Sequence, residues 1–362
     1  MSKTNNKQNE ENDQHEKNDQ NQKYKDKGLS GLSNLGNTCF INSCMQILSH
    51  TYELNSFLDK ETYKKKLKNN CDSILLNEWD NLRKLLWNEN CVISPGKFIK
   101  TIQKVARIKG MDMFTGFSQN DLPEFLLFVV DCFHTAIARE IKMTISGNSE
   151  NETDEIAKVC FEMIKRMYSK EYSEVWNIFF AIHVSEISSL ETKERLNITP
   201  EPFFMIDLPI PANNKSPSLI DCFDLYVEGE LMEGDNSWFN EKTGKKENVR
   251  KKILFWSFPS ILVIDFKRFN ARNQKNQIFI TFPFDNLDLS NYVIGYKKNS
   301  YIYELYGVCN HSGGVLGGHY TAYVKNANGK WYHFNDTNVS EVGVIDSIIS
   351  PKAYCLFYRK KQ

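Results

Sequence analysis

The order of the expected elements predicts an α+β fold, with helices in the first half of the chain and strands in the second. Before about residue 170, apolar residues recur at helical spacing in several segments. After about residue 175, short runs rich in Ile, Val, Phe and Tyr alternate with Gly, Pro and Asn. Helices followed by strands are typical of an α+β domain, here with a mostly antiparallel sheet. The 362 residues suffice for one large core or for two subdomains.

The first 27 residues differ in composition from the rest of the chain. They are nearly all Asn, Gln, Lys, Glu and Asp, with Tyr24 as their one aromatic residue. Such a segment cannot bury enough apolar surface to offset the entropy lost on ordering. We therefore expect residues 1–27 to be a disordered polar tail, with a specific interaction arm as the alternative. The folded domain is expected to span residues 28–360.

The expected helices follow from apolar periodicity and from their start and stop signals. Residues 29–37 are rich in Gly, Ser and Asn and predict a loop, after which Thr38 is a plausible N-cap. A Ser-Pro pair at 94–95 and a glycine at 110 bound another helix. The remaining helices are expected over residues 74–87, 121–141 and 155–168.

The expected strands are short apolar runs separated by turn residues. They cover residues 261–269, 301–309, 319–325, 330–335 and 353–359. Between the third and fourth of these, Asn326, Ala327, Asn328 and Gly329 predict a hairpin connection.

Charge and cysteine content exclude several classes of protein. Lys plus Arg number 45, as do Asp plus Glu, and a net charge near zero argues against a nucleic-acid binder with a strong basic field. No apolar run is long enough to span a bilayer, and the N-terminus has no hydrophobic signal region, so we expect a soluble, non-exported protein. The nine cysteines are scattered without C-x-x-C spacing, which predicts reduced thiols in the cytosol or nucleus.

Cys39 is the first candidate for chemistry. It follows the flexible loop and opens the first helix, where unpaired N–H groups and the helix dipole favour a thiolate. The same position also suits a small buried residue at the start of a helix. The side chain of Asn34, in the entry loop, and the backbone N–H of Cys39 are candidate donors for an oxyanion.

His319 is the second candidate, after Gly317 and Gly318, which permit close backbone approach. If the hairpin loop has four residues, His319 lies opposite Asp336. A three-residue loop with a bulge at Gly329 places it opposite Asn335 instead. Either residue can orient the imidazole as the third member of a Cys-His pair. The alternative is that Asn335 and Asp336 simply form a turn.

Four segments resemble the ubiquitin-specific protease family of papain-like cysteine peptidases. Residues 31–43 (GLSNLGNTCFINS) resemble its cysteine box, and residues 306–308, 318–323 and 331–336 resemble its histidine box. Residues 119–125 (QNDLPEF) are similar to the Gln-Gln-Asp segment, and residues 261–269 (ILVIDFKRF) to the Leu-Lys-Arg-Phe strand. The matches occur in order across residues 28–360, which makes the resemblance specific.

The resemblance implies a papain-like fold with a helical thumb, at about residues 28–170, and β fingers and palm, at about 171–360. It implies hydrolysis of the bond after the C-terminal glycine of ubiquitin. The implied catalytic residues are the nucleophile Cys39, the base His319, the orienting residue Asn335 with Asp336 next to it, and the oxyanion donor Asn34. The implied substrate-binding residues are Asp121, for the basic ubiquitin tail, and Gly317, Gly318 and Tyr320, beside a narrow channel for its Gly-Gly end.

The sequence departs from the family pattern where many members carry two C-x-x-C zinc pairs. The corresponding residues are 189–192 (SLET) and 240–243 (NEKT), which lack thiolates, so we expect no metal. Asn120, Pro123 and Phe40 replace more usual residues without removing a catalytic group.

Together these observations predict a thiol-dependent deubiquitinase that requires no cofactor. Its expected partners are ubiquitin and ubiquitinated proteins, with no nucleic acid and no membrane, and the chain is expected to act as a monomer. Ubiquitin chemistry implies the cytoplasm or nucleus of a eukaryotic cell, or an organism living inside one. The alternatives are an inactive ubiquitin-binding module and a protease for another ubiquitin-like modifier.

Overall fold

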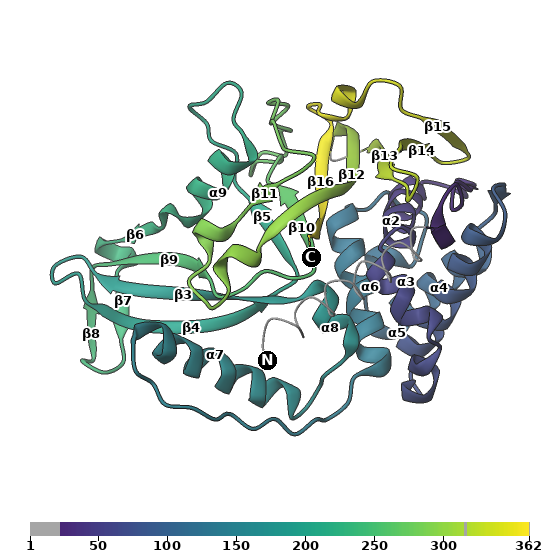
Figure 1. Ribbon diagram of the computed structural model, residues 1–362. Coiled ribbons are helices and arrows are strands. Elements are labelled where there is room, and N and C mark those ends of the chain that lie inside the picture. Colours follow the sequence, from purple (N-terminus) through teal and green to yellow (C-terminus); the bar gives the residue numbers. More distant parts are fainter. Residues whose placement is uncertain (1–21, 315–316, 362) are drawn as a thin grey trace, which may run out of the picture. The chain divides into compact units, whose positions relative to one another are not determined.

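The computed structural model describes residues 22–314 and 317–361, which form two compact units (Figure 1). The first unit comprises Met1–Ala136 and Tyr306–Ile348, and the second comprises Ile137–Leu305 and Ile349–Gln362. The expected division near residue 170 differs from this one. Residues 306–348 join the N-terminal helices because two of their strands pack on the helix that begins at Cys39.

The helices of the first unit largely follow the periodicity of the sequence. They are α2 (Cys39–Ser49), α3 (Tyr52–Asp59), α4 (Cys71–Asn88), α5 (Gly96–Lys109) and α6 (Leu122–Ile137), with the 3₁₀ helices η1 (Thr62–Lys66), η2 (Asp112–Phe114) and η6 (Ile345–Ile348). Every residue of α2 is buried, which makes it the central helix of this unit. Gly110 ends α5 with φ of 69°, a left-handed conformation that glycine adopts without strain. Helix α3 was not among the expected elements.

The antiparallel sheet of the first unit carries the histidine box. Its strand order is β15-β14-β13-β12, with β12 (Ile302–Gly314), β13 (Gly317–Lys325), β14 (Trp331–Asn335) and β15 (Asn338–Glu341). Helix α2 packs on β13 and β14 (Figure 1). Strands β1 (Gly31–Leu32) and β2 (Val92–Ile93) form a short parallel pair. In sequence, β1 precedes α2 and β2 precedes α5. The division between the units falls within β12, after Leu305.

Part of the N-terminal segment is folded onto the first unit. The ring of Tyr24 is buried, stacks on Tyr52 with ring centroids 4.8 Å apart, and meets the edge of Trp87. Its hydroxyl donates to Asp59 over 2.8 Å. The expectation of disorder is therefore wrong for residues 22–27, because the buried Tyr24 ring and hydrogen bonds to Asp26 and Lys27 hold this segment to the first unit. Residues 1–21 lie outside the described residues.

The second unit holds three helices and two larger sheets. Its helices are α7 (Glu152–Tyr168), α8 (Glu174–Phe179) and α9 (Leu219–Glu228), with the 3₁₀ helices η3 (Gly234–Asn236), η4 (Ser290–Tyr292) and η5 (Lys298–Ser300). One sheet has the order β4-β3-β9-β6, from β3 (Ala181–Ser189), β4 (Arg195–Phe203), β6 (Glu230–Met232) and β9 (Val249–Phe255). The other contains β16 (Ala353–Lys360), β10 (Ile261–Phe266) and β5 (Met205–Leu208) in that order, and β11 (Leu287–Asp288) pairs with the start of β12. Strands β7 (Trp238–Asn240) and β8 (Lys245–Glu247) form a hairpin.

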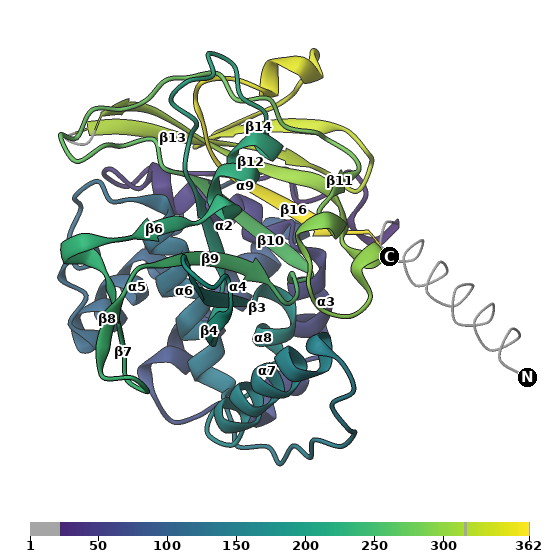
Figure 2. The same ribbon diagram turned by 90° about the vertical axis from the view of Figure 1, so that its left-hand side faces the viewer.

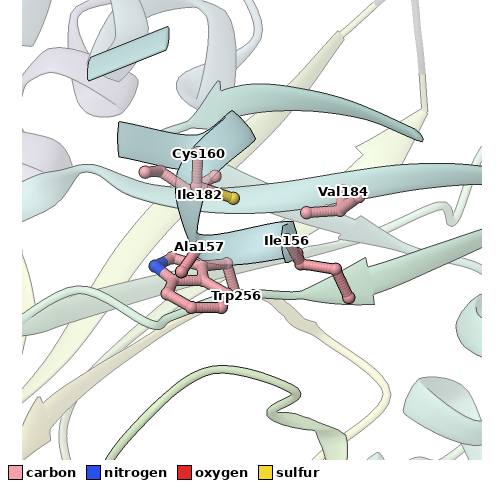
Figure 3. Packing of buried hydrophobic residues seen from close by; sticks show 6 residues of the cluster. All are labelled: Ile156, Ala157, Cys160, Ile182, Val184 and Trp256. Carbon is pink, nitrogen blue, oxygen red and sulfur yellow. The ribbon is translucent and has the colours of Figure 1, made fainter. Parts of the chain in front are cut away.

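Helix α7 packs its apolar face against the sheet of the second unit and runs alongside β4 (Figure 2). Its residues Ile156, Ala157 and Cys160 meet Ile182 and Val184 of β3, and Trp256 completes the cluster (Figure 3). Spacings of four residues on the helix and two on the strand place these side chains on facing sides. Cys160 serves here as a small hydrophobe, as its apolar surroundings predict.

All nine cysteines are free thiols, and most are buried. In the described part of the chain, the helices are too short or too polar to cross a bilayer.

Candidate active site

Cys39 is the first residue of α2, and its side chain is 2% exposed. Thr38 occupies the expected N-cap position. Among the described residues, its side chain bonds to no N–H of the helix and instead accepts the N–H of Leu35 over 2.9 Å. Thr38 therefore stabilises the entry loop, while the N–H groups at the helix start remain available to the nucleophile and to a bound oxyanion.

The environment of the Cys39 thiol contains opposing contributions. Burial is the largest and raises its pKa above the ordinary value of 9.0, and the negative charge of Asp336 raises the pKa further. Backbone N–H groups of Tyr320, Phe40 and Cys39 itself lower the pKa. The expected effect of the helix start is thus present, but desolvation outweighs it. These contributions favour the thiol form of Cys39, so a nucleophilic attack by this sulfur calls for a base.

His319 lies on β13 beside the residue whose backbone reaches the nucleophile. The N–H of Tyr320 hydrogen-bonds to the Cys39 sulfur, so β13 brings the histidine and α2 together. The Nε2 atom of His319 lies 2.7 Å from Oδ1 of Asn335 at the end of β14. An amide oxygen only accepts, so Nε2 carries the proton and Nδ1 is the basic nitrogen. This is the tautomer that proton transfer from a thiol requires.

The hairpin register differs from both expected registers. Lys325 pairs with Trp331 rather than with Lys330, and the pairing begins at Ala322. In this register Asn335 extends the ladder opposite Thr321, so it lies diagonally across from His319 on the same face of the sheet. The next residue, Asp336, lies in the turn after the strand, and its side chain bonds to Asn34 and Asn42 instead. The register therefore assigns Asn335 to the imidazole.

Asn34 is oriented by its own loop. Its Oδ1 accepts the backbone N–H groups of Gly36 and Thr38, both over 3.1 Å. Its Nδ2 donates to Oδ2 of Asp336 over 3.0 Å. Because a carboxylate only accepts, these bonds fix which end of the amide is the donor. One Nδ2 hydrogen is left for a developing oxyanion.

Asp336 connects the entry loop, the nucleophile helix and the histidine hairpin. Its Oδ1 accepts from Nδ2 of the buried Asn42 over 2.8 Å, and its carbonyl accepts the N–H of Leu32 over 2.9 Å. It stands in the two-residue turn between β14 and β15 with φ of 51°. A Cβ on Gly31 would lie 2.3 Å from the Thr337 carbonyl oxygen, so only glycine lets the entry loop approach this turn. The turn thus consists of Asp336 and Thr337 and follows Asn335 directly, and the side chains of Asn335 and Asp336 also bond to candidate site residues.

The expected substrate-binding residues differ in how closely they are packed and in what they contact. A Cβ on Gly318 would lie 2.3 Å from Nε2 of His311, whereas the nearest atom to a Cβ on Gly317 is 3.8 Å away. The ring of Tyr320 is buried against His311, with centroids 4.6 Å apart, so its backbone N–H, rather than its side chain, faces the nucleophile. Asp121 is half-buried, and its carbonyl accepts the N–H of Phe125 at the start of α6. Its contact with a substrate remains a prediction.

Two further residues contact the site, although the sequence motifs that contain them predict no role for them. Asn42 lies one helical turn after Cys39, and a polar residue beside the nucleophile candidate on a largely apolar helix is the signal that indicates it. The side chain of Gln119 bonds to the backbone of Gly318. The residues around Gln119 in the sequence predict only a loop, so no local pattern indicates this contact.

The segments that lack zinc thiolates are stabilised by hydrogen bonds. Asn240 and Thr243 donate to the carboxylate of Glu247 over 2.9 and 2.7 Å, and the hydroxyl of Ser189 accepts the N–H groups of Glu191 and Thr192. In residues 22–314 and 317–361, no group of three or more His, Cys, Asp and Glu side chains is arranged to hold a metal ion. The absence of zinc from the protein remains a prediction.

The fold and this constellation define a papain-like cysteine peptidase, and comparison with known proteins identifies its family. The model of the ubiquitin carboxyl-terminal hydrolase family matches residues 30–358, so the chain belongs to that family. It is 33% identical over 345 residues to ubiquitin carboxyl-terminal hydrolase 2 of Bos taurus, covering 92% of this chain and 55% of the relative. It is 31% identical over 362 residues to ubiquitin carboxyl-terminal hydrolase 21 of Homo sapiens, covering 92% and 62%. The chain thus spans a little more than half the length of these relatives.

Solved structures agree with the expected fold. The SAGA deubiquitinase module of Ubp8, Sgf11, Sus1 and Sgf73 bound to monoubiquitin contains a chain that is 25% identical, with a TM-score of 0.69 over 92% of this chain and 70% of that one. The same module bound to ubiquitin aldehyde gives a TM-score of 0.70 at 24% identity. The α+β, papain-like fold class and the family resemblance are confirmed.

Proposed function

We propose that this chain is a thiol-dependent deubiquitinase that hydrolyses the bond after the C-terminal glycine of ubiquitin. The observation that supports the proposal is the backbone contact of Tyr320, the residue after His319, with the Cys39 thiol, together with the 2.7 Å approach of His319 Nε2 to Oδ1 of Asn335. Membership of the ubiquitin carboxyl-terminal hydrolase family supports the reaction class. The relative bound to monoubiquitin supports ubiquitin as the partner.

Acylation begins from the neutral thiol. As the Cys39 sulfur attacks the glycine carbonyl carbon, Nδ1 of His319 takes the thiol proton, and a C–S bond replaces the C=O π bond. The resulting oxyanion accepts hydrogen bonds from Nδ2 of Asn34 and from the N–H of Cys39. Asp336 takes no direct part in this step. It keeps the Asn34 donor in place.

Collapse of the tetrahedral intermediate breaks the C–N bond, and the imidazolium gives its proton to the departing lysine amine. A thioester between Cys39 and ubiquitin remains. His319 then removes a proton from water as the water oxygen attacks the thioester carbonyl. The C–S bond breaks, and the sulfur recovers its proton. These steps use side chains of the protein alone and balance without a cofactor.

Substrate recognition is proposed to use the residues beside this site. A narrow channel beside Gly317 and Gly318 is proposed to favour a substrate whose own end is narrow, such as a Gly-Gly tail. The carboxylate of Asp121 is proposed to pair with a basic residue of that tail. Both assignments rest on the resemblance to the family and on the placement of these residues in the first unit.

The test is turnover of ubiquitin carrying a C-terminal fluorophore. The unchanged chain is expected to release the fluorophore, Cys39→Ala to abolish release while retaining ubiquitin affinity, and Asn335→Ala to lower kcat about a hundredfold by freeing the imidazole. Turnover by Cys39→Ala near that of the unchanged chain would refute the nucleophile. Ubiquitin binding without turnover by the unchanged chain would indicate an inactive binding module.

Selectivity and assembly need separate measurements. Probes made from ubiquitin and from other ubiquitin-like modifiers, each with a C-terminal electrophile, are expected to label Cys39 only in the ubiquitin case. Preferential labelling by another modifier would replace the proposed substrate. We also propose a monomer acting in the cytoplasm or nucleus, in contrast to the multi-chain module of the solved relative. Light scattering of the full chain tests its oligomeric state, and imaging of a tagged chain in its own cell tests its location.

A further inference from the structure

We propose that Gln119 is a positioning residue, which holds the strand carrying His319 in place through the backbone of Gly318. Gln119 lies in the loop between η2 and α6, far from β13 in sequence. This role is distinct from substrate contact and from the hydrogen bond that orients the imidazole. Only the expected effect on turnover rests on the proposed function.

The side chain of Gln119 makes two hydrogen bonds to a single residue. Its Nε2 donates to the carbonyl oxygen of Gly318 over 2.6 Å, and its Oε1 accepts the N–H of Gly318 over 2.5 Å. A primary amide has one donor end and one acceptor end, so it satisfies both backbone groups of one strand residue at once. Gln119 therefore replaces a neighbouring strand at this position.

The bonds lie on the edge of β13 that faces the nucleophile. Backbone groups of residues two apart point to the same edge of a strand, so the N–H of Tyr320 shares that edge with the N–H and carbonyl of Gly318. The Tyr320 N–H bonds to the Cys39 sulfur. Gln119 and Cys39 thus contact the same edge, on either side of the residue that provides the base, His319.

The ladder with β14 does not extend to this part of the strand. Strand β14 pairs with β13 from Ala322 to Lys325, on the side of β13 away from β12. At Gly318 the opposite edge pairs with Gly313 of β12. Without Gln119, the edge from Gly317 to Tyr320 would lack the two hydrogen bonds that hold it against the helical part of the unit. A strand residue that is held on one edge only has more freedom to move. The imidazole of the adjacent His319 then gains the same freedom.

Gln119 is exposed, so its role is not one of core packing. Replacing it by Met keeps its length and neutral charge and removes both bonds. Gln103 supplies a matched control, because its Nε2 donates over 3.0 Å to the carbonyl of Gly116 in the same loop. Gln103→Met therefore removes one side-chain hydrogen bond to this loop and leaves β13 unchanged.

The experiment compares Gln119→Met with Gln103→Met in two assays. With the ubiquitin fluorophore substrate, Gln119→Met is expected to lower kcat about tenfold to a hundredfold, with KM changed less than about threefold, because small misplacement of a base costs rate rather than binding. With iodoacetamide, the pH at which Cys39 alkylation becomes half-maximal is expected to rise by about half a unit, because the Tyr320 N–H no longer favours the thiolate. Gln103→Met is expected to match the unchanged chain in both assays.

Three results would overturn the proposal. Unchanged kcat and an unchanged alkylation profile would mean that the bonds position nothing. A rise in KM alone would make Gln119 a substrate contact, and faster turnover would make it a gate. If the unchanged chain hydrolyses no ubiquitin conjugate, the proposed function fails, yet the alkylation profiles still decide whether Gln119 positions the strand. Thermal unfolding of both variants, expected within about 2 °C of the unchanged chain, excludes misfolding as the cause.

Discussion

The carboxylate of Asp336 bonds to Asn34 and Asn42, whereas its neighbour Asn335 bonds to His319. Two consecutive residues therefore support two different parts of the site. In the proposed mechanism, Asn335 serves the proton-transfer side, and Asp336 serves the oxyanion side. The end of β14 separates these contacts, because Asn335 is the last residue of the strand whereas Asp336 begins the turn, with φ of 51°.

Asp336→Asn should impair catalysis while making the thiol more acidic. A carboxamide offers one acceptor oxygen in place of two, so either Asn34 or Asn42 loses its partner, and kcat should fall about tenfold to a hundredfold. Removal of the negative charge that raises the Cys39 pKa should lower that pKa. Steady-state kinetics and iodoacetamide pH profiles measure the two effects. Thr337→Ala, in the same turn, is the control, and a kcat of Asp336→Asn equal to that of the control would contradict the assignment.

The alkylation rate of Cys39 should rise steadily from pH 7 to beyond pH 9. Burial raises its pKa above 9.0, so the thiolate fraction grows about tenfold per pH unit in that range. The folded state therefore binds this proton more tightly than the unfolded chain does. The stabilisation is present below pH 9 and is lost as the pH rises through the folded-state pKa. Mass spectrometry of the Cys39 peptide measures the rate, and a plateau below pH 8 would indicate a preformed thiolate–imidazolium pair instead.

Adjacent glycines should respond differently to the same substitution. In Gly318→Ala the new Cβ would lie 2.3 Å from the His311 ring and 2.6 Å from the Ser312 carbonyl oxygen, so the backbone must shift. We expect the free energy of unfolding to fall by about 1–3 kcal/mol. In Gly317→Ala the atom nearest to the new Cβ is 3.8 Å away, so we expect the free energy of unfolding to change by no more than about 0.5 kcal/mol. Denaturant unfolding compares them, and equal losses would show that the close approach to β12 is not the cause.

Tyr24 should matter for stability despite its polar surroundings in the sequence. Tyr24→Ala removes a ring that is 3% exposed and stacked on Tyr52, at a cost of about 3 kcal/mol. Tyr24→Phe keeps the ring and loses only the hydrogen bond to Asp59, at a cost of about 1 kcal/mol. Urea unfolding curves give both values. A Tyr24→Ala variant as stable as the unchanged chain would mean that residues 22–27 contribute nothing to the fold.

Short-range patterns in the sequence predicted most of the α-helices, five of the strands and the candidate chemistry-bearing residues. Apolar spacing located α4, α5 and α7 within three residues at each end, and turn residues located the hairpin of β13 and β14. The motifs around Cys39 and His319 predicted the reaction class, because a nucleophile at a helix start and a histidine beside glycines are local features. Such features depend on residues a few positions apart, which the sequence displays directly.

The sequence by itself determined most of the helices, the strands of the histidine hairpin, the family resemblance and the set of candidate residues. The tertiary structure decided the burial of Tyr24, the bond from Gln119 to Gly318, and the sign of the pKa shift at Cys39, since each depends on residues distant in the chain. It also decided that Asn335, rather than Asp336, faces His319. A register change of one residue exchanges the two faces of a strand, and the position of a loop in the hairpin sets that register.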